Sequence, residues 1–136
     1  MEILELHHVS LPTRDLERSR TFYRDVLGLA EIQRPPFGFP GAWFRLGDRE
    51  LHLIGNAEDA QGGSGTDPNQ LHFAIRVARF GEMVEGLKRL GFREDAQLGD
   101  PMHLVVRLRP VTGYPQAYLT DPDRHLIEIN AADPDS

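Results

Sequence analysis

Six histidines and 21 acidic residues are the side chains of this chain that could bind a metal ion, because the sequence contains no cysteine. Three histidines, His8, His52 and His72, stand in short segments where apolar and polar residues alternate, which predicts β-strands. A fourth segment of this kind carries Glu128. Imidazole and carboxylate together suit Fe, Zn, Ni, Mn or Co, and two histidines with one carboxylate are the ligands of non-haem Fe(II) enzymes.

The four candidate ligands are expected on the same kind of sheet face, because successive side chains of a strand point to opposite sides. Each candidate lies opposite a pair of apolar residues that can pack under a helix; the pairs are Val9 and Leu11, Leu51 and Leu53, Phe73 and Ile75, and Ile127 and Ile129. The same alternation places His7 and His125 on the apolar face, away from the candidate ligands. His103 lies in 97–114, a stretch whose secondary structure the sequence leaves undecided. The alternative is that the histidines are hydrogen-bonded structural residues and Glu128 is a surface carboxylate.

The elements that must position these residues occur twice in the same order. A strand over 4–11 precedes a helix from Asp15 to Gly28, and a strand over 71–77 precedes a helix over 80–90. Further strands are expected at 29–33, 42–46, 50–54, 116–120 and 125–130. We therefore expect a single domain over 1–136, with one module at about 1–56, a flexible Gly-rich linker at about 57–69 and a second module at about 70–132.

Composition excludes several classes of protein. The net charge of -6 makes nucleic acid an unsuitable partner, since proteins that bind polyanions are usually basic. The apolar runs are far shorter than the roughly 18 residues of a membrane span, so no membrane partner is expected. The first residues lack the basic and apolar regions of a secretory signal, which predicts a cytoplasmic protein.

Two segments carry a family resemblance. The segment HHVSLPTRDLERSRTFYRDVLGL resembles the opening strand and helix of the vicinal oxygen chelate superfamily, and YLTDPDRHLIEIN resembles its closing strands. GAWFRLGDRELHLIG and LHFAIRV are similar to the middle strands. The superfamily includes glyoxalase I, methylmalonyl-CoA epimerase, fosfomycin and bleomycin resistance proteins and extradiol dioxygenases.

The resemblance implies an α+β fold, in which two βαβββ modules form a cupped, barrel-like mixed sheet with the helices on the outside. The metal ligands of the family fall on His8, His52, His72 and Glu128, and the metal would be Fe, Zn, Ni, Mn or Co. Two residues depart from the family pattern. His52 stands where glyoxalase I-like enzymes have a Glu that can act as ligand and base, and Arg124 replaces a turn glycine.

Three functions follow from the resemblance. One is a metal-dependent lyase or isomerase of glyoxalase type, with Glu128 or His52 as the base and Tyr118 as a hydrogen-bond donor to the substrate. The second is an Fe(II) dioxygenase, and the third is a metal-free binding protein of the bleomycin resistance kind. Each would act on a small molecule, and the short two-module members of the family predict a homodimer. Phe37 or Phe39 could add an apolar wall, and Arg45 could bind a substrate carboxylate.

Overall fold

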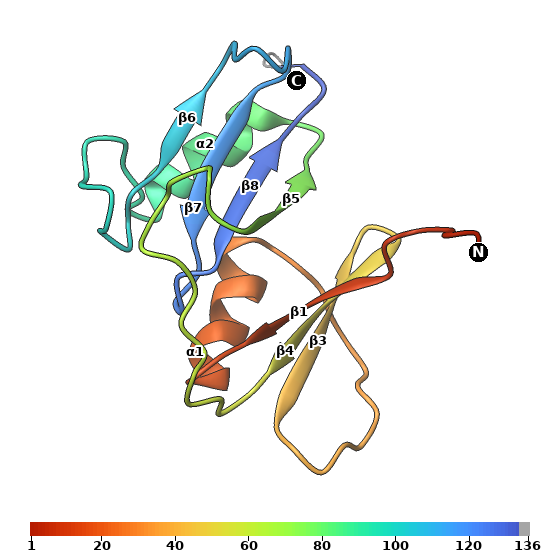
Figure 1. Cartoon of the computed structure of the whole chain (residues 1–136). Coiled ribbons are helices and arrows are strands. Elements are labelled where there is room, and N and C mark those ends of the chain that lie inside the picture. The colour runs from red at the N-terminus through yellow and green to blue at the C-terminus, as the bar shows by residue number, and fades with distance from the viewer. Residues whose placement is uncertain (134–136) are drawn as a thin grey trace. The chain divides into compact units, whose positions relative to one another are not determined.

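Two compact units, Met1–Gln61 and Gly62–Ser136, make up the chain in the computed structural model, which describes residues 1–133. The first unit contains β1 (His8–Pro12), α1 (Leu16–Thr21), a π-helical turn η1 (Phe22–Val26), β2 (Glu31–Ile32), β3 (Gly41–Leu46) and β4 (Arg49–Ile54). The second unit contains β5 (His72–Arg76), α2 (Phe80–Arg89), β6 (Val105–Arg107), β7 (Gln116–Thr120) and β8 (Leu126–Asn130) (Figure 1). The βαβββ order therefore occurs twice.

Each unit has a four-stranded mixed sheet with the same topology. The strand order is β1-β4-β3-β2 in the first unit and β5-β8-β7-β6 in the second. In both, the first strand pairs in parallel with the last, and the remaining pairs are antiparallel. The stretch 97–114, whose secondary structure the sequence leaves undecided, contains β6, an edge strand of three residues.

Helix α1 begins where the sequence indicates. The side chain of Asp15 accepts a hydrogen bond from the backbone N–H of Arg18 at 3.1 Å, which caps the helix. After the π-helical turn, Gly28 adopts φ +70°, a left-handed conformation in which a glycine commonly follows the end of a helix. Among residues 1–133, no helix is long and apolar enough to cross a membrane.

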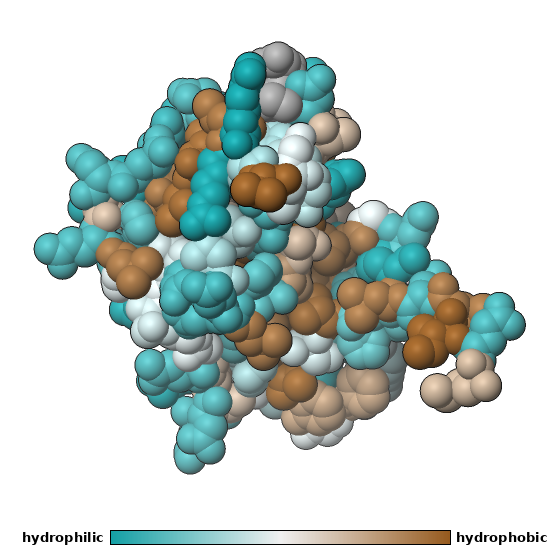
Figure 2. Space-filling view, turned by 45° about the horizontal axis from the view of Figure 1, so that its top comes forward, coloured by the Kyte–Doolittle hydropathy of each residue, from teal (hydrophilic) through white to brown (hydrophobic). Residues whose placement is uncertain are grey.

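Strand β1 is shorter than expected at its start. It begins at His8, not at residue 4, because its partner β4 begins at Arg49 and the register pairs His8 with Glu50. The His7 carbonyl still accepts from the N–H of Glu50 at 3.3 Å, but residues 1–6 belong to no strand. Ile3, Leu4 and Leu6 are exposed, and apolar surface gathers over this N-terminal segment at the right of Figure 2.

The apolar faces of both sheets are buried, as the alternation predicts. In the first unit Phe44, Leu51 and Leu53 are at most 2% exposed, and the Tyr23 ring lies 6.1 Å from that of Phe44. In the second unit the core contains residues of β7, β8 and α2, namely Ala117, Leu119, Ile127, Ile129, Phe80, Val84 and Leu87. Burial of these faces leaves the candidate ligands on the opposite side of each sheet.

The Gly-rich segment expected to be flexible is partly held by the second unit. The N–H groups of Gly62 and Gly63 donate to the carbonyls of Asp123 and Arg124 at 2.7 and 3.0 Å. A Cβ at Gly62 would lie 2.4 Å from the Arg124 carbonyl oxygen, so a larger residue does not fit without movement. Thr66 Oγ1 lies 2.5 Å from His103 Nδ1. The second half of the segment is therefore ordered by side-chain and backbone contacts.

Candidate functional site

His72 and Glu128 lie together on the face of the second sheet that is opposite its apolar core. Their nearest atoms, His72 Nε2 and Glu128 Oε2, are 3.3 Å apart. The other ring nitrogen, Nδ1, lies 2.8 Å from the carbonyl oxygen of Gln70. Because a carbonyl can only accept, Nδ1 donates its N–H to Gln70, and Nε2 is the ring nitrogen that faces the carboxylate.

Two amides orient the Glu128 carboxylate. Gln116 Nε2 donates to Glu128 Oε1 at 2.8 Å, and Asn130 Nδ2 donates to the same oxygen at 3.2 Å. Burial alone would raise the pKa of Glu128, but these hydrogen bonds and the neighbouring His72 hold it below its ordinary value. The carboxylate is therefore charged at neutral pH, and its second oxygen faces His72.

Tyr118 is the neighbour of Glu128 across β7 and β8, since these two residues are paired in the register. Its ring lies 5.8 Å from the His72 ring, edge to face, and it is 3% exposed. Burial, followed by the charge of Glu128 and a hydrogen bond with it, raises the pKa of the Tyr118 hydroxyl. The hydroxyl therefore stays protonated at neutral pH and can donate a hydrogen bond.

The first unit brings His8 and His52 together on its own sheet. The two rings are stacked, with centroids 4.2 Å apart and planes at 19°. The Trp43 ring stacks on the His52 ring, with centroids 3.9 Å apart and planes at 3°. His7, just before β1, places Nδ1 2.9 Å from Nδ1 of His8. Burial, then the charges of His52 and His7, lower the pKa of His8, so it is neutral at neutral pH, the form that binds metals.

Glu50 is a further site residue that the sequence analysis missed. It pairs with His8 in the register, and its Oε1 lies 2.9 Å from Nε2 of His52. The hydrogen bond with His52 lowers the pKa of Glu50, against a smaller effect of burial. The alternation of side chains along a strand could have identified it, because Glu50 stands two residues before His52 and so shares its face.

The remaining histidines make other contacts within the second unit. His103 lies beside Thr66, and the backbone N–H of His125 donates to Asp121 Oδ1 at 2.9 Å in the turn before β8. His125 precedes β8, the strand of Glu128. Their exclusion from a metal site stays a prediction.

The donors form one group in each unit, and in residues 1–133 no three of them converge as a preformed metal site. The rings of His8 and His52 are stacked, so both could bind one ion only after one of the rings turns. The pair of His72 and Glu128 does fit a cation, because Nε2 of His72 and a carboxylate oxygen of Glu128, two atoms that can each bind a metal ion, lie 3.3 Å apart. A histidine whose other N–H donates to a backbone carbonyl is also typical of metal sites.

Aromatic side chains extend the first unit's site along β3 and the loop before it. Phe37 lies 6.0 Å from Trp43 and 5.4 Å from Phe39, and both phenylalanines are about half exposed. The Arg34 guanidinium lies 4.8 Å from both phenylalanine rings and donates to the carbonyl of Phe39 at 2.8 Å. The rings of Phe39, Phe37, Trp43 and His52 therefore form a continuous series in the first unit.

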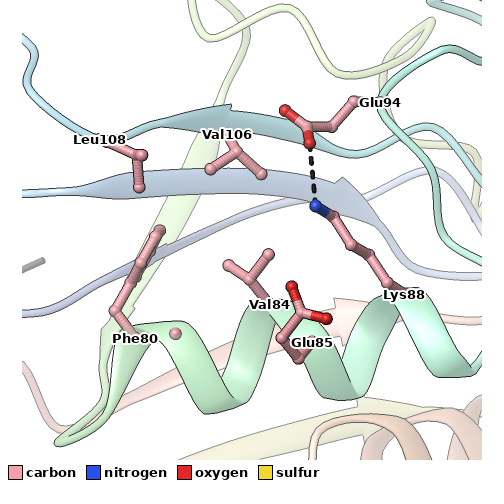
Figure 3. Close-up of a pocket in the computed structure, with 8 residues that line it drawn as sticks. Phe80, Val84, Glu85, Lys88, Glu94, Val106 and Leu108 are labelled. Carbon is pink, nitrogen blue, oxygen red and sulfur yellow. Dashed lines mark ion pairs between the residues drawn. The ribbon is translucent and has the colours of Figure 1, made fainter. Parts of the chain in front are cut away.

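A cavity of about 390 Å³ lies on the other face of the second sheet. Figure 3 shows its apolar lining between α2 and β6, with the ion pair of Lys88 and Glu94 at 3.1 Å beside it. Val106 of this lining pairs with Ala117 of the buried core, so the cavity lies on the side of α2 and not on that of Glu128. It is separate from the candidate site.

Comparison with known proteins agrees with this fold. Residues 5–129 match the model of the Glyoxalase/Bleomycin resistance protein/Dioxygenase superfamily. The chain belongs to this superfamily. Among curated superfamily relatives, Glyoxylase I 4 of Arabidopsis thaliana is 27% identical over 132 residues, which cover 95% of this chain and 71% of that protein.

Solved structures of the superfamily share the fold. A glyoxalase family protein from Bacillus anthracis superposes with a TM-score of 0.76 at 20% identity, covering 96% of this chain and 97% of that one. A fosfomycin resistance protein from Listeria monocytogenes superposes with a TM-score of 0.70 at 21% identity, covering 96% of this chain and 95% of that one. Lactoylglutathione lyase from Agrobacterium tumefaciens gives 0.65 at 20% identity, covering 96% of each chain. The expected α+β fold of two βαβββ modules is confirmed.

Proposed function

We propose that the chain is a metal-dependent enzyme of glyoxalase type, which chelates an oxygen-bearing small molecule for lyase or isomerase chemistry. His8, His72 and Glu128 would hold a divalent ion, Fe, Zn, Ni, Mn or Co, with His52 as a fourth ligand or as the base. The observation that supports this most is the approach of His72 Nε2 to Glu128 Oε2 at 3.3 Å, while Nδ1 of the same ring is held by the Gln70 carbonyl. When bound, the metal would supply a Lewis acid that stabilises charge on a substrate oxygen.

The side chains around this ion would bind the substrate and move a proton. Tyr118 would turn its hydroxyl, which interacts with Glu128 in this structure, to donate a hydrogen bond to a substrate oxygen. His52 is the better placed of the two candidate bases, because Glu50 lies 2.9 Å from its Nε2 and would hold the ring with Nδ1 as the basic atom. Glu128 has its Oε1 occupied by Gln116 and Asn130, which supports a role in holding the ion.

A second candidate function is an Fe(II)-dependent dioxygenase. Two histidines and one carboxylate are the ligands of that class, and His8, His72 and Glu128 are such a set. His52 would then act as a neighbouring acid or base. The third alternative, metal-free binding of a small molecule, would leave the paired donors of both units without a chemical role.

We also propose that the protein works in the cytoplasm as a homodimer. The donors occur as one group in each of two units, so a complete site could combine units of one chain or of two chains. Light scattering at micromolar concentration tests the proposal, since a monomer there would contradict it.

The experiment for the main proposal starts from protein purified without added metal. Its metal content is measured by mass spectrometry, and the metal-free form is then loaded with Ni(II), Zn(II) or Fe(II). We expect isomerisation of a hemithioacetal with Ni(II) or Zn(II). Cleavage of a catechol with Fe(II) and O₂ would favour the dioxygenase instead, and failure of all three ions to bind would contradict both enzymes.

A further inference from the structure

A row of four polar side chains crosses the second sheet beside Glu128. The strand register pairs Arg76 with Asn130, Asn130 with Gln116, and Gln116 with Arg107. Asn130 stands two residues after Glu128, so the whole row lies on the face of the candidate site. Each end of the row carries a guanidinium group, and two amides lie between them.

A hydrogen bond orients Arg76, and each of the two guanidinium groups lies near a tyrosine ring. Arg76 Nε donates to Asn130 Oδ1 at 2.9 Å, and its guanidinium carbon lies 5.2 Å from the centre of the Tyr114 ring. The guanidinium carbon of Arg107 lies 5.8 Å from the Tyr118 ring centre. Nε of Arg76 already donates to Asn130, so the two terminal nitrogens of the guanidinium remain as donors. Two such parallel donors can bind both oxygens of a carboxylate.

The charge of these arginines is not balanced by acidic side chains. In the described part of the chain, neither Arg76 nor Arg107 takes part in an ion pair, and both are exposed. The nearest carboxylate along the row's contacts is Glu128, whose Oε1 already accepts from Gln116 and Asn130. A positively charged, oriented row therefore borders the negatively charged candidate ligand.

We infer that this row binds an acidic group of the substrate, so that the substrate is a small oxyanion-bearing molecule such as a carboxylic acid. The inference rests on the proposed function for the role of the site, but the anion site itself can be tested alone. Same-face residues of a strand are about 7 Å apart. The substrate would therefore carry its acidic group several bonds away from the oxygens that are chelated beside Glu128.

The test uses metal-free protein and succinate as the probe, with succinamide as its uncharged equivalent. Nuclear magnetic resonance detects the side-chain Nε–H signals of both arginines during each titration. We expect succinate to shift these signals and succinamide to leave them unchanged. Arg76→Gln and Arg107→Gln should each weaken succinate binding about tenfold, the size of one lost charge-assisted hydrogen bond. Arg76→Lys should give an intermediate loss, because it keeps the charge without the fork.

The matched control is Arg89→Gln, which removes the same charge from α2. It should bind succinate like the wild type. Equal binding of succinate and succinamide, or equal weakening by all three glutamine variants, would overturn the inference. Metal titration of the wild type and of Arg76→Gln separates this result from the main proposal. If the wild type binds succinate at the row but binds no metal, the proposed enzyme is contradicted and the anion site stands.

Discussion

Trp43 lies flat against His52, with ring centroids 3.9 Å apart and planes at 3°. On its other side His52 stacks on His8 at 4.2 Å. The imidazole is thus held between an indole and a second imidazole, while Glu50 lies 2.9 Å from its Nε2. Because Trp43 is the single tryptophan of the chain, the tryptophan fluorescence reports on the surroundings of this one residue.

Metal binding at His52 should change the emission of Trp43, because the indole is in direct contact with the ring that would lose electron density. Titration of metal-free protein with Zn(II), followed by fluorescence, measures the change. The variant His52→Leu should lose most of it, while His103→Leu, which alters a contact with Thr66, should behave like the wild type. An unchanged spectrum at a Zn(II) concentration that saturates the protein in calorimetry would exclude His52 from the site.

The hydroxyl of Tyr118 should ionise above the ordinary tyrosine value of about 10. Burial is the main cause, and the charge of Glu128 adds to it. Absorbance at 295 nm against pH measures the titration. The chain has three tyrosines, and comparison with Tyr118→Phe identifies the part of the absorbance change that comes from Tyr118. Glu128→Gln should move the titration back toward lower pH. If that variant leaves the titration unchanged, the two side chains do not interact.

The same shift has a consequence for stability. A group whose pKa is higher in the folded than in the unfolded chain favours folding below the unfolded value. The stabilisation from Tyr118 is therefore present below about pH 10 and declines as the pH rises toward the folded pKa. Urea unfolding at pH 9 and above, compared with Tyr118→Phe, should show a steeper loss in the wild type.

Loss of an amide that orients Glu128 should destabilise the fold. Gln116→Ala removes the 2.8 Å hydrogen bond to a buried carboxylate and leaves that charge less well solvated. We expect a loss of about 1–3 kcal/mol in the free energy of unfolding, measured by urea denaturation. A loss near zero would mean that water replaces the amide and that Gln116 does not position Glu128.

Substitution of Gly62 should free the segment that is held by the second unit. In Gly62→Ala the new Cβ would meet the Arg124 carbonyl oxygen at 2.4 Å, so the segment must move. We expect faster cleavage within residues 57–70 in limited proteolysis. Gly38→Ala is the control, because no atom lies within 4 Å of a Cβ at that position. Equal cleavage of both variants would show that the contact does not order the segment.

The sequence was sufficient to place His8, His52, His72 and Glu128 on the sheet faces opposite the core, because the period of a strand is two residues and apolar pairs mark the buried side. Local signals also marked Asp15 as a helix cap. The approach of Glu50 to His52 was not predicted, since side-chain rotamers decide it. The row from Arg76 to Arg107 depends on register between four strands, which no single segment encodes.

The docking of Gly62 on Arg124 was missed for a different reason. Gly-rich composition indicates a flexible linker, but it also allows close approach to another backbone, and tertiary contacts decide between the two. The short strand β6 was left open because Pro and Gly residues surround it and only its pairing with β7 defines it.

Calorimetric titration of metal-free variants with Ni(II) or Zn(II) tests the central claim most directly. The wild type should bind one ion per complete site, and His8→Ala, His72→Ala and Glu128→Ala should each weaken binding by at least about tenfold, because each removes one of few ligands. His7→Ala and His125→Ala should bind like the wild type. Loss of binding in His7→Ala with retention in His8→Ala would show that the assigned strand face is wrong. Unchanged binding in both His72→Ala and Glu128→Ala would contradict the metal site itself.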